Sequence, residues 1–214
     1  MIYEVRTYDL KPHSLPEVEK RFGEAYEHRK KLSPLFAFWH TEIGPLNQII
    51  HVWGYKDLAE RSRVRAEAVK DAANWPPKIR EFIVSQRSEI MNPLPVSPDV
   101  KPGKMGPCYE MRIYTLAGGA EVPKLVKLWE RGLPERTKFS PLCAAWVSEF
   151  GALNQFIHIW PYKSVDERNE IRKKAQATGM WPPSVLAKKE GLPPYEILKQ
   201  ENKILMPSAF SPLQ

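Results

Sequence analysis

The chain has 214 residues, a formal net charge of +7 and a hydrophobic content of 43%, which are ordinary values for a globular protein. No apolar run approaches the roughly 18 residues that a membrane-spanning helix needs, so the sequence predicts no membrane span. Lysine and arginine alternate with acidic residues along the expected helix faces, which disfavours a nucleic-acid-binding surface. Together these features predict a cytoplasmic protein.

The first strand is expected from Ile2 to Leu10, and a helix follows it. Ser14 with Glu17 three residues later is typical of a capping box at the start of a helix. Ser33-Pro34 should end this helix, because a residue before proline avoids the helical region. A second strand is then expected from Leu35 to Ile43.

A turn at Gly44-Pro45-Leu46-Asn47 leads directly into another strand, which predicts a β-hairpin. Asp57 and Glu60 form a second capping pattern, so another helix should begin here. Trp75-Pro76-Pro77 follows this helix, and a last strand is expected from Phe82 to Met91.

The same order of elements then occurs a second time. The stretch from Gly44 to Lys56 returns as Gly151 to Lys163, at a spacing of 107 residues. The second copy carries eight additional residues, within which Lys188 to Pro194 is expected to form a loop. A proline-rich segment separates the copies, so we predict a first repeat at residues 1–92, a linker at 93–107 and a second repeat at 108–214.

Each repeat has the order β-α-β-β-α-β, which is the ferredoxin-like order. Two helices would cover one face of a four-stranded antiparallel sheet, and the other face would need a partner. The predicted fold class is therefore α+β, with two tandem ferredoxin-like repeats packed sheet to sheet as an intramolecular α/β barrel.

Strand alternation separates the side chains of each sheet into two faces. We expect the polar and aromatic face to lie between the two sheets, including Glu4, Arg6, Tyr8, His51, Trp53 and Tyr55 with their second-repeat equivalents. The apolar face, which includes Val5, Ile50 and Val52, is expected to lie under the helices. Trp39 and Trp146 are also expected to face the helices.

The repeated motifs resemble those of the NIPSNAP family, a branch of the dimeric α/β-barrel superfamily. The resemblance rests on Tyr-Glu-x-Arg-x-Tyr at the start of each repeat and Gly-x-Leu-Asn-x-x-x-His-x-Trp-x-Tyr in its middle. It covers almost the whole chain twice. It implies the barrel fold and a superfamily that includes cofactor-independent monooxygenases, haem-degrading enzymes and lactone isomerases. It implies no settled activity for the family itself.

The candidate catalytic residues occupy equivalent positions in the two repeats: His51, His158, Arg6 and Arg112. Each histidine could transfer a proton, or could be a hydrogen-bonded core residue. Each arginine could hold an oxygen anion, or could form a buried ion pair with the glutamate two residues before it. The candidate substrate-binding residues are Glu4, Tyr8, Asn47, Trp53, Tyr55, Glu110, Tyr114, Asn154, Trp160 and Tyr162.

The sequence contains no phosphate-binding loop, nucleophile elbow or zinc-ligand spacing, so neither a metal nor a cofactor is expected. Two functions stay open. The barrel could bind a small molecule between its sheets, as a cofactor-independent oxygenase or isomerase would. Alternatively it could be a non-catalytic binding or scaffold protein whose barrel is filled by aromatic side chains. Association into a homo-oligomer also stays open.

Overall fold

The computed structural model describes residues 1–118 and 120–214, and these form two repeats of similar structure. The first repeat contains β1 (Ile2–Leu10), α1 (Leu15–Arg29), β2 (Leu35–Ile43), β3 (Gln48–Tyr55), α2 (Leu58–Ala68), the short helix η1 (Arg80–Phe82) and β4 (Ile83–Pro93). The second repeat contains β5 (Cys108–Leu116), α3 (Glu121–Arg136), β6 (Ala144–Phe150), β7 (Gln155–Tyr162), α4 (Val165–Ala177), α5 (Pro183–Glu190) and β8 (Ile197–Pro207). The predicted order of elements is confirmed.

Two of the helices, α2 and α4, begin at a residue whose side chain accepts a hydrogen bond from a free backbone N–H group. Asp57 accepts a hydrogen bond from the backbone N–H of Glu60 at 2.8 Å, and Ser164 accepts one from Glu167 at 3.1 Å. The capping box expected at Ser14 is wrong, because its hydroxyl instead donates to the carbonyl of Lys11 at 2.6 Å. The expected loop from Lys188 is also partly wrong, since α5 extends to Glu190.

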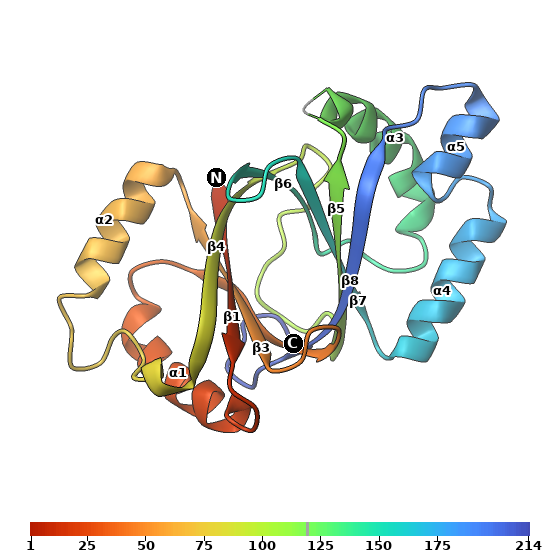
Figure 1. The fold of residues 1–214 in the computed structure, drawn as a ribbon. Coiled ribbons are helices and arrows are strands. Elements are labelled where there is room, and N and C mark those ends of the chain that lie inside the picture. Colours follow the sequence, from red (N-terminus) through yellow and green to blue (C-terminus); the bar gives the residue numbers. More distant parts are fainter. Residues whose placement is uncertain (119) are drawn as a thin grey trace.

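The strands form one closed antiparallel barrel in the order β1-β3-β2-β8-β5-β7-β6-β4. Each repeat contributes four consecutive strands. The two sheets join where β2 pairs with β8 and where β4 pairs with β6. Figure 1 shows the strands in the middle of the molecule, with α1 and α2 on one side and α3, α4 and α5 on the other. The predicted intramolecular α/β barrel is confirmed.

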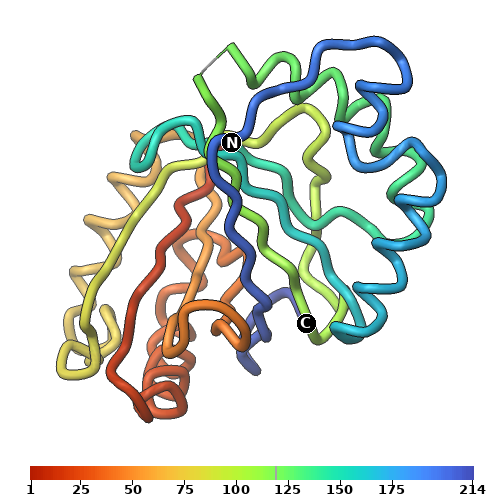
Figure 2. The backbone as a smooth tube through the Cα atoms, turned by 45° about the vertical axis from the view of Figure 1, so that its right-hand side comes forward, coloured from red at the N-terminus to blue at the C-terminus, as the bar shows by residue number. Residues whose placement is uncertain are grey.

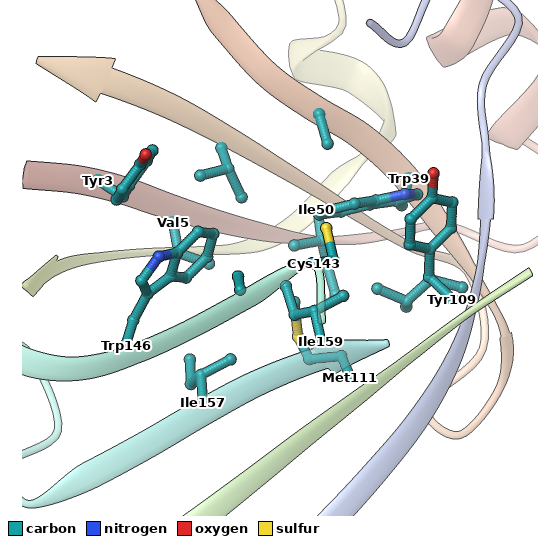
Figure 3. Close-up of a cluster of buried hydrophobic side chains, with 14 of the residues drawn as sticks. Tyr3, Val5, Trp39, Ile50, Tyr109, Met111, Cys143, Trp146, Ile157 and Ile159 are labelled. Atoms are coloured by element: carbon teal, nitrogen blue, oxygen red, sulfur yellow. The ribbon is translucent and has the colours of Figure 1, made fainter. Parts of the chain in front are cut away.

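Apolar side chains from both repeats pack together in the middle of this barrel, and polar ones such as Thr7, Gln48 and Lys203 lie toward one end. Trp39 and Trp146 are almost completely buried there, each against a tyrosine of the other repeat. Figure 3 shows these residues together with Val5, Met111, Ile157 and Ile159 between the strands. Side chains alone can fill a barrel of eight strands, so no ligand is needed to complete this core.

The assignment of the two sheet faces is therefore the reverse of the expectation. The apolar face with Val5, Ile50 and Val52 lies inside the barrel, and so do Trp39 and Trp146. The face with His51 lies outside, under the helices. The physical reason is that α1 and α3 carry the buried arginines Arg29 and Arg136, which can pair with polar sheet residues, whereas the side chains in the middle of the barrel are apolar.

The segments after β4 and β8 each pack on the opposite repeat. The backbone N–H of Leu94 donates to the carbonyl of Ala145 in β6, and that of Ser208 donates to the carbonyl of Phe38 in β2. In Figure 2 the chain end returns from the second repeat to lie beside the first. Among the described residues, no helix is long and apolar enough to cross a membrane.

Candidate functional site

Each repeat has a pocket between the outer face of its sheet and its own helices. The first pocket has a cavity volume of about 480 Å³, and the second one of about 260 Å³. Residues at equivalent positions line both, beginning with Arg6 and Arg112 on the first strand of each repeat. Small-molecule sites commonly have volumes of roughly 300 Å³ or more, so the first pocket is large enough for a ligand.

A buried glutamate and three arginines form a cluster beside the first pocket, and two of these arginines, Arg6 and Arg65, line it. Glu4 is 0% exposed and accepts hydrogen bonds from Arg6 at 3.0 Å, Arg61 at 2.7 Å and Ser88 at 2.7 Å. Arg65 lies 3.5 Å from the same carboxylate oxygen. Burial alone would raise the pKa of Glu4, but the hydrogen bonds from Arg61 and Ser88 and the nearby arginines lower it to about 2. This carboxylate therefore stays ionised and is a poor proton acceptor.

The second repeat contains the same cluster around Glu110. Arg112 donates to this carboxylate at 3.2 Å, Arg168 also donates to it, and Arg172 lies 3.9 Å away. The arginines of α2 and α4 are thus structural partners of the two glutamates.

The two candidate histidines each form a hydrogen bond with a tryptophan. The indole N–H of Trp53 donates to Nδ1 of His51 at 2.7 Å, and that of Trp160 donates to Nδ1 of His158 at 2.8 Å. An indole can only donate, so Nδ1 must be the accepting nitrogen and Nε2 must carry the proton. Burial lowers the pKa of both histidines well below its ordinary value, with further lowering by Arg6 and Arg112 respectively. Each imidazole is therefore neutral and offers one N–H donor.

The N–H group at Nε2 of each histidine has no hydrogen-bond partner in the described part of the chain. Nε2 of His51 and Nε2 of His158 are both buried without a hydrogen bond, although the two residues are only 2% and 3% exposed. Buried N–H groups are nearly always paired. Both histidines line their pockets, so a bound molecule could supply the acceptor.

A second buried donor distinguishes the first pocket. Arg29 of α1 lies over the ring of Trp53 with 4.6 Å between its guanidinium carbon and the ring centroid, and it donates to the hydroxyl of Tyr55 at 3.2 Å. Its Nη1 has no partner among the described residues, although Arg29 is 3% exposed.

The equivalent arginine of the second repeat is satisfied. Arg136 donates to Ser140 at 2.8 Å and to Tyr162 at 2.9 Å. In the first repeat the corresponding serine, Ser33, is itself buried without a partner. The hydrogen bond between arginine and serine that Arg136 makes in the second repeat is therefore missing between Arg29 and Ser33 in the first.

The sequence model of the NIPSNAP family matches residues 3–98 and 109–212. The chain belongs to the NIPSNAP family. The human protein NipSnap homolog 3A is 29% identical to it over 100% of this chain and 86% of the relative. A NipSnap homolog from Dictyostelium discoideum is 28% identical over 84% of this chain and 78% of the relative.

Solved structures outside the family share the fold. A "Putative monooxygenase" from Fusobacterium nucleatum covers 97% of this chain and 92% of its own, with a TM-score of 0.68 and 12% identity. An anthrone oxidase-like protein covers 96% of this chain and 90% of its own, with a TM-score of 0.60 and 8% identity. At such low identity the likeness extends to the fold alone.

Most of the candidate residues lie in the two pockets, though outside the barrel. The first pocket is lined by Arg6, Tyr8, His51, Trp53 and Tyr55, and the second by Glu110, Arg112, Tyr114, His158, Trp160 and Tyr162. Glu4 lies beneath the first pocket as the partner of Arg6. Asn47 and Asn154 line neither pocket. Both have positive φ angles, 55° and 58°, which asparagine tolerates in turns.

Several pocket residues were not among the candidates. They are Arg29 and Arg136, together with Trp75 and Trp181 from the Trp-Pro-Pro segment of each repeat. A signal for the arginines was available, since they occupy equivalent positions near the ends of equivalent helices. Among the described residues, no group of His, Cys, Asp or Glu could hold a metal ion.

Proposed function

We propose that this protein binds a small, largely apolar molecule with an anionic oxygen in the first pocket. The observation that carries the proposal is the unpartnered Nη1 of Arg29, a buried cation in an aromatic wall. A buried charged donor without a partner costs free energy, and a carboxylate, phenolate or enolate oxygen would supply the missing acceptor.

The remaining groups of the pocket favour the same class of ligand. His51 offers a second unpartnered N–H donor. Glu4 does not line the pocket; its Oε1 is held by arginines and its Oε2 is a buried acceptor without a partner. The two unpartnered buried groups that do line the pocket, Nη1 of Arg29 and Nε2 of His51, are both donors. Phe22, Trp53 and Trp75 also line it and provide flat apolar surface for a ring.

Binding of an aromatic anion tests this proposal. The probe is 1-anilinonaphthalene-8-sulfonate, and N-phenyl-1-naphthylamine is the matched neutral compound with the same rings. Titration calorimetry should give tighter binding of the anion than of the neutral compound. Arg29→Met should weaken anion binding by about tenfold, the effect of losing roughly 1.4 kcal/mol of interaction.

Arg136→Met in the second repeat is the matched control and should leave this affinity unchanged. Near-ultraviolet circular dichroism checks that each variant keeps its tertiary packing. Equal binding of both compounds, or an Arg29→Met variant that is folded and binds the anion as well as the wild type, would contradict the proposal.

Catalysis is a second candidate function, and the same two donors favour one form of it. Arg29 and His51 could stabilise an enolate, the electron-rich species that reacts with O₂ in a cofactor-independent oxygenase. Neither Nδ1 of His51 nor Glu4 is free to remove a proton, so such a substrate would have to ionise by itself. Oxygen consumption with anthrone as the probe substrate tests this, and a rate that is the same with and without the protein would exclude it for this substrate.

A further inference from the structure

The two pockets share most of their lining but differ in two bulky residues. The position of Phe22 in the first repeat is occupied by Trp129 in the second, and both residues line their pockets. The second repeat also places Tyr195 at its pocket, from the segment that contains its eight additional residues. The cavity there is about 260 Å³, compared with about 480 Å³ in the first repeat.

Trp129 and Tyr195 contact each other across the second pocket. The indole N–H of Trp129 lies 3.4 Å from the hydroxyl of Tyr195, in donating orientation. Trp129 also packs edge-on against Trp181, with ring centroids 5.0 Å apart. These three aromatic residues therefore form one connected wall from α3 to the segment before β8.

The wall is held in place by close packing of α5 on α3. Gly132 of α3 has no side chain, and a Cβ there would meet the carbonyl oxygen of Met180 at 3.0 Å and the side chain of Leu186 at 3.6 Å. Leu186 of α5 is 0% exposed. This close contact fixes α5, and the chain continues from the end of α5 to Tyr195.

In the first pocket Phe22 packs edge-on against Trp75, with ring centroids 5.7 Å apart, but no aromatic residue in the described part of the chain takes the place of Tyr195 there. Ile79 and Arg80, at the start of η1, line the first pocket instead. Phe22 has a smaller ring than Trp129 and is backed by Phe210 of the C-terminal segment, with centroids 6.4 Å apart and planes within 7°. The space that Trp129 and Tyr195 occupy in the second repeat is thus left within the cavity of the first.

We propose that Trp129 and Tyr195 close the second pocket to aromatic anions that the first pocket admits. The chain then binds one such anion, although it contains two copies of the site. This inference rests on the function proposed for the first pocket. It assigns to Trp129 and Tyr195 the role of determining ligand size, while a buried arginine and a histidine with an unpartnered Nε2 are present in both repeats.

The number of bound probe molecules per chain tests the inference. Titration with 1-anilinonaphthalene-8-sulfonate should give one site in the wild type and one additional site in the double variant Trp129→Phe, Tyr195→Ala. Adding Arg136→Met to the double variant removes the buried positive charge of the second pocket and should weaken the additional site, which would locate it there. Tyr195→Ala alone removes a partly exposed residue and serves if the double variant does not fold.

The outcomes separate this inference from the proposed function. If the wild type binds no probe, the proposed function is contradicted. A site gained in the double variant would still support the closure of the second pocket by Trp129 and Tyr195. The closure of the second pocket is overturned if the wild type has two equal sites. It is also overturned if the double and single variants fold but show no additional site. The converse variant, Phe22→Trp, should weaken binding at the first pocket, and unchanged binding there would contradict the role given to ring size.

Discussion

Tyr3 of the first repeat stacks on Trp146 of the second, with ring centroids 4.7 Å apart and planes inclined by 23°. Both residues point into the barrel, and Trp146 is 1% exposed. The pair therefore belongs to a core that neither repeat could form by itself. Its energetic contribution can be measured separately from that of the pockets.

Trp146→Ala should lower the free energy of unfolding by about 3–5 kcal/mol, because it leaves a large cavity among apolar neighbours. Urea denaturation measures this loss. The affinity of the first pocket for 1-anilinonaphthalene-8-sulfonate should not change, since Trp146 lies on the opposite face of the sheets. Loss of probe binding in a folded Trp146→Ala variant would place the ligand inside the barrel instead.

Stability should fall as the pH is lowered from about 6.5 to about 4.5. The pKa of His51 and His158 lies well below 6.5 in the folded chain, so below pH 6.5 the unfolded state binds more protons. Each histidine should contribute a loss of up to about 1.4 kcal/mol per pH unit in this range. Urea denaturation at several pH values measures the slope.

The double variant His51→Gln, His158→Gln is the control for this pH dependence. It should lose most of the slope between pH 6.5 and 4.5, because its two buried positions no longer take up protons on unfolding. An unchanged slope would show that other groups cause the dependence. Glu4 cannot contribute much in this range, since its pKa of about 2 affects stability only as the pH falls below 4.5.

Glu4→Gln should destabilise the first repeat by about 3–5 kcal/mol, because it removes the buried partner of Arg6 and Arg61 and leaves their charges uncompensated. Glu110→Gln should have a similar effect in the second repeat. Thermal or urea denaturation measures both. The exposed Glu42→Gln is the control and should change stability by less than about 0.5 kcal/mol. If Glu4→Gln also changes the free energy of unfolding by less than about 0.5 kcal/mol, the cluster of Glu4 and its arginines does not stabilise the fold.

Gly23→Ala should have opposite effects in two backgrounds. A Cβ at Gly23 would lie 2.9 Å from the ring of Phe210, so in the wild type the C-terminal segment must move to accommodate it. In a Phe210→Ala background the same change should stabilise α1 by roughly 1 kcal/mol, the usual advantage of alanine over glycine in a helix. A double-mutant cycle of unfolding free energies measures the coupling. Additive effects would mean that Phe210 does not pack on α1 in solution.

The fold could be predicted from the sequence because most helices and strands occur in both repeats, so each could be predicted from two separate stretches of sequence. Capping pairs such as Asp57 with Glu60, and the turn before β3, mark boundaries locally. Ser14 carries the same pattern but makes a different hydrogen bond. Its backbone is helical, whereas that of Asp57 is extended, and its hydroxyl donates to the carbonyl of Lys11. Local patterns thus identify an element more reliably than they identify its hydrogen bonds.

The location of the site could not be predicted, because alternation separates two faces without indicating which one is inside. His51 and Val52 are equally buried, one under helices and the other in the barrel. The decisive residue was Arg29, which belongs to α1 and so is not part of the strand pattern. Its helix carries a charge into the layer between helix and sheet, and only the tertiary structure reveals that this layer is polar.

The exchange of terminal segments between the repeats has a topological consequence. The chain leaves β4, packs on the second repeat and enters β5 through residues 101–107, whereas after β8 it packs on the first repeat and stops at Gln214. By the symmetry of the repeats, Val100 corresponds to Gln214 and Pro107 to Met1. A single break of the backbone within 101–106 would therefore leave the two halves still held together by Leu94 on β6 and by Ser208 on β2.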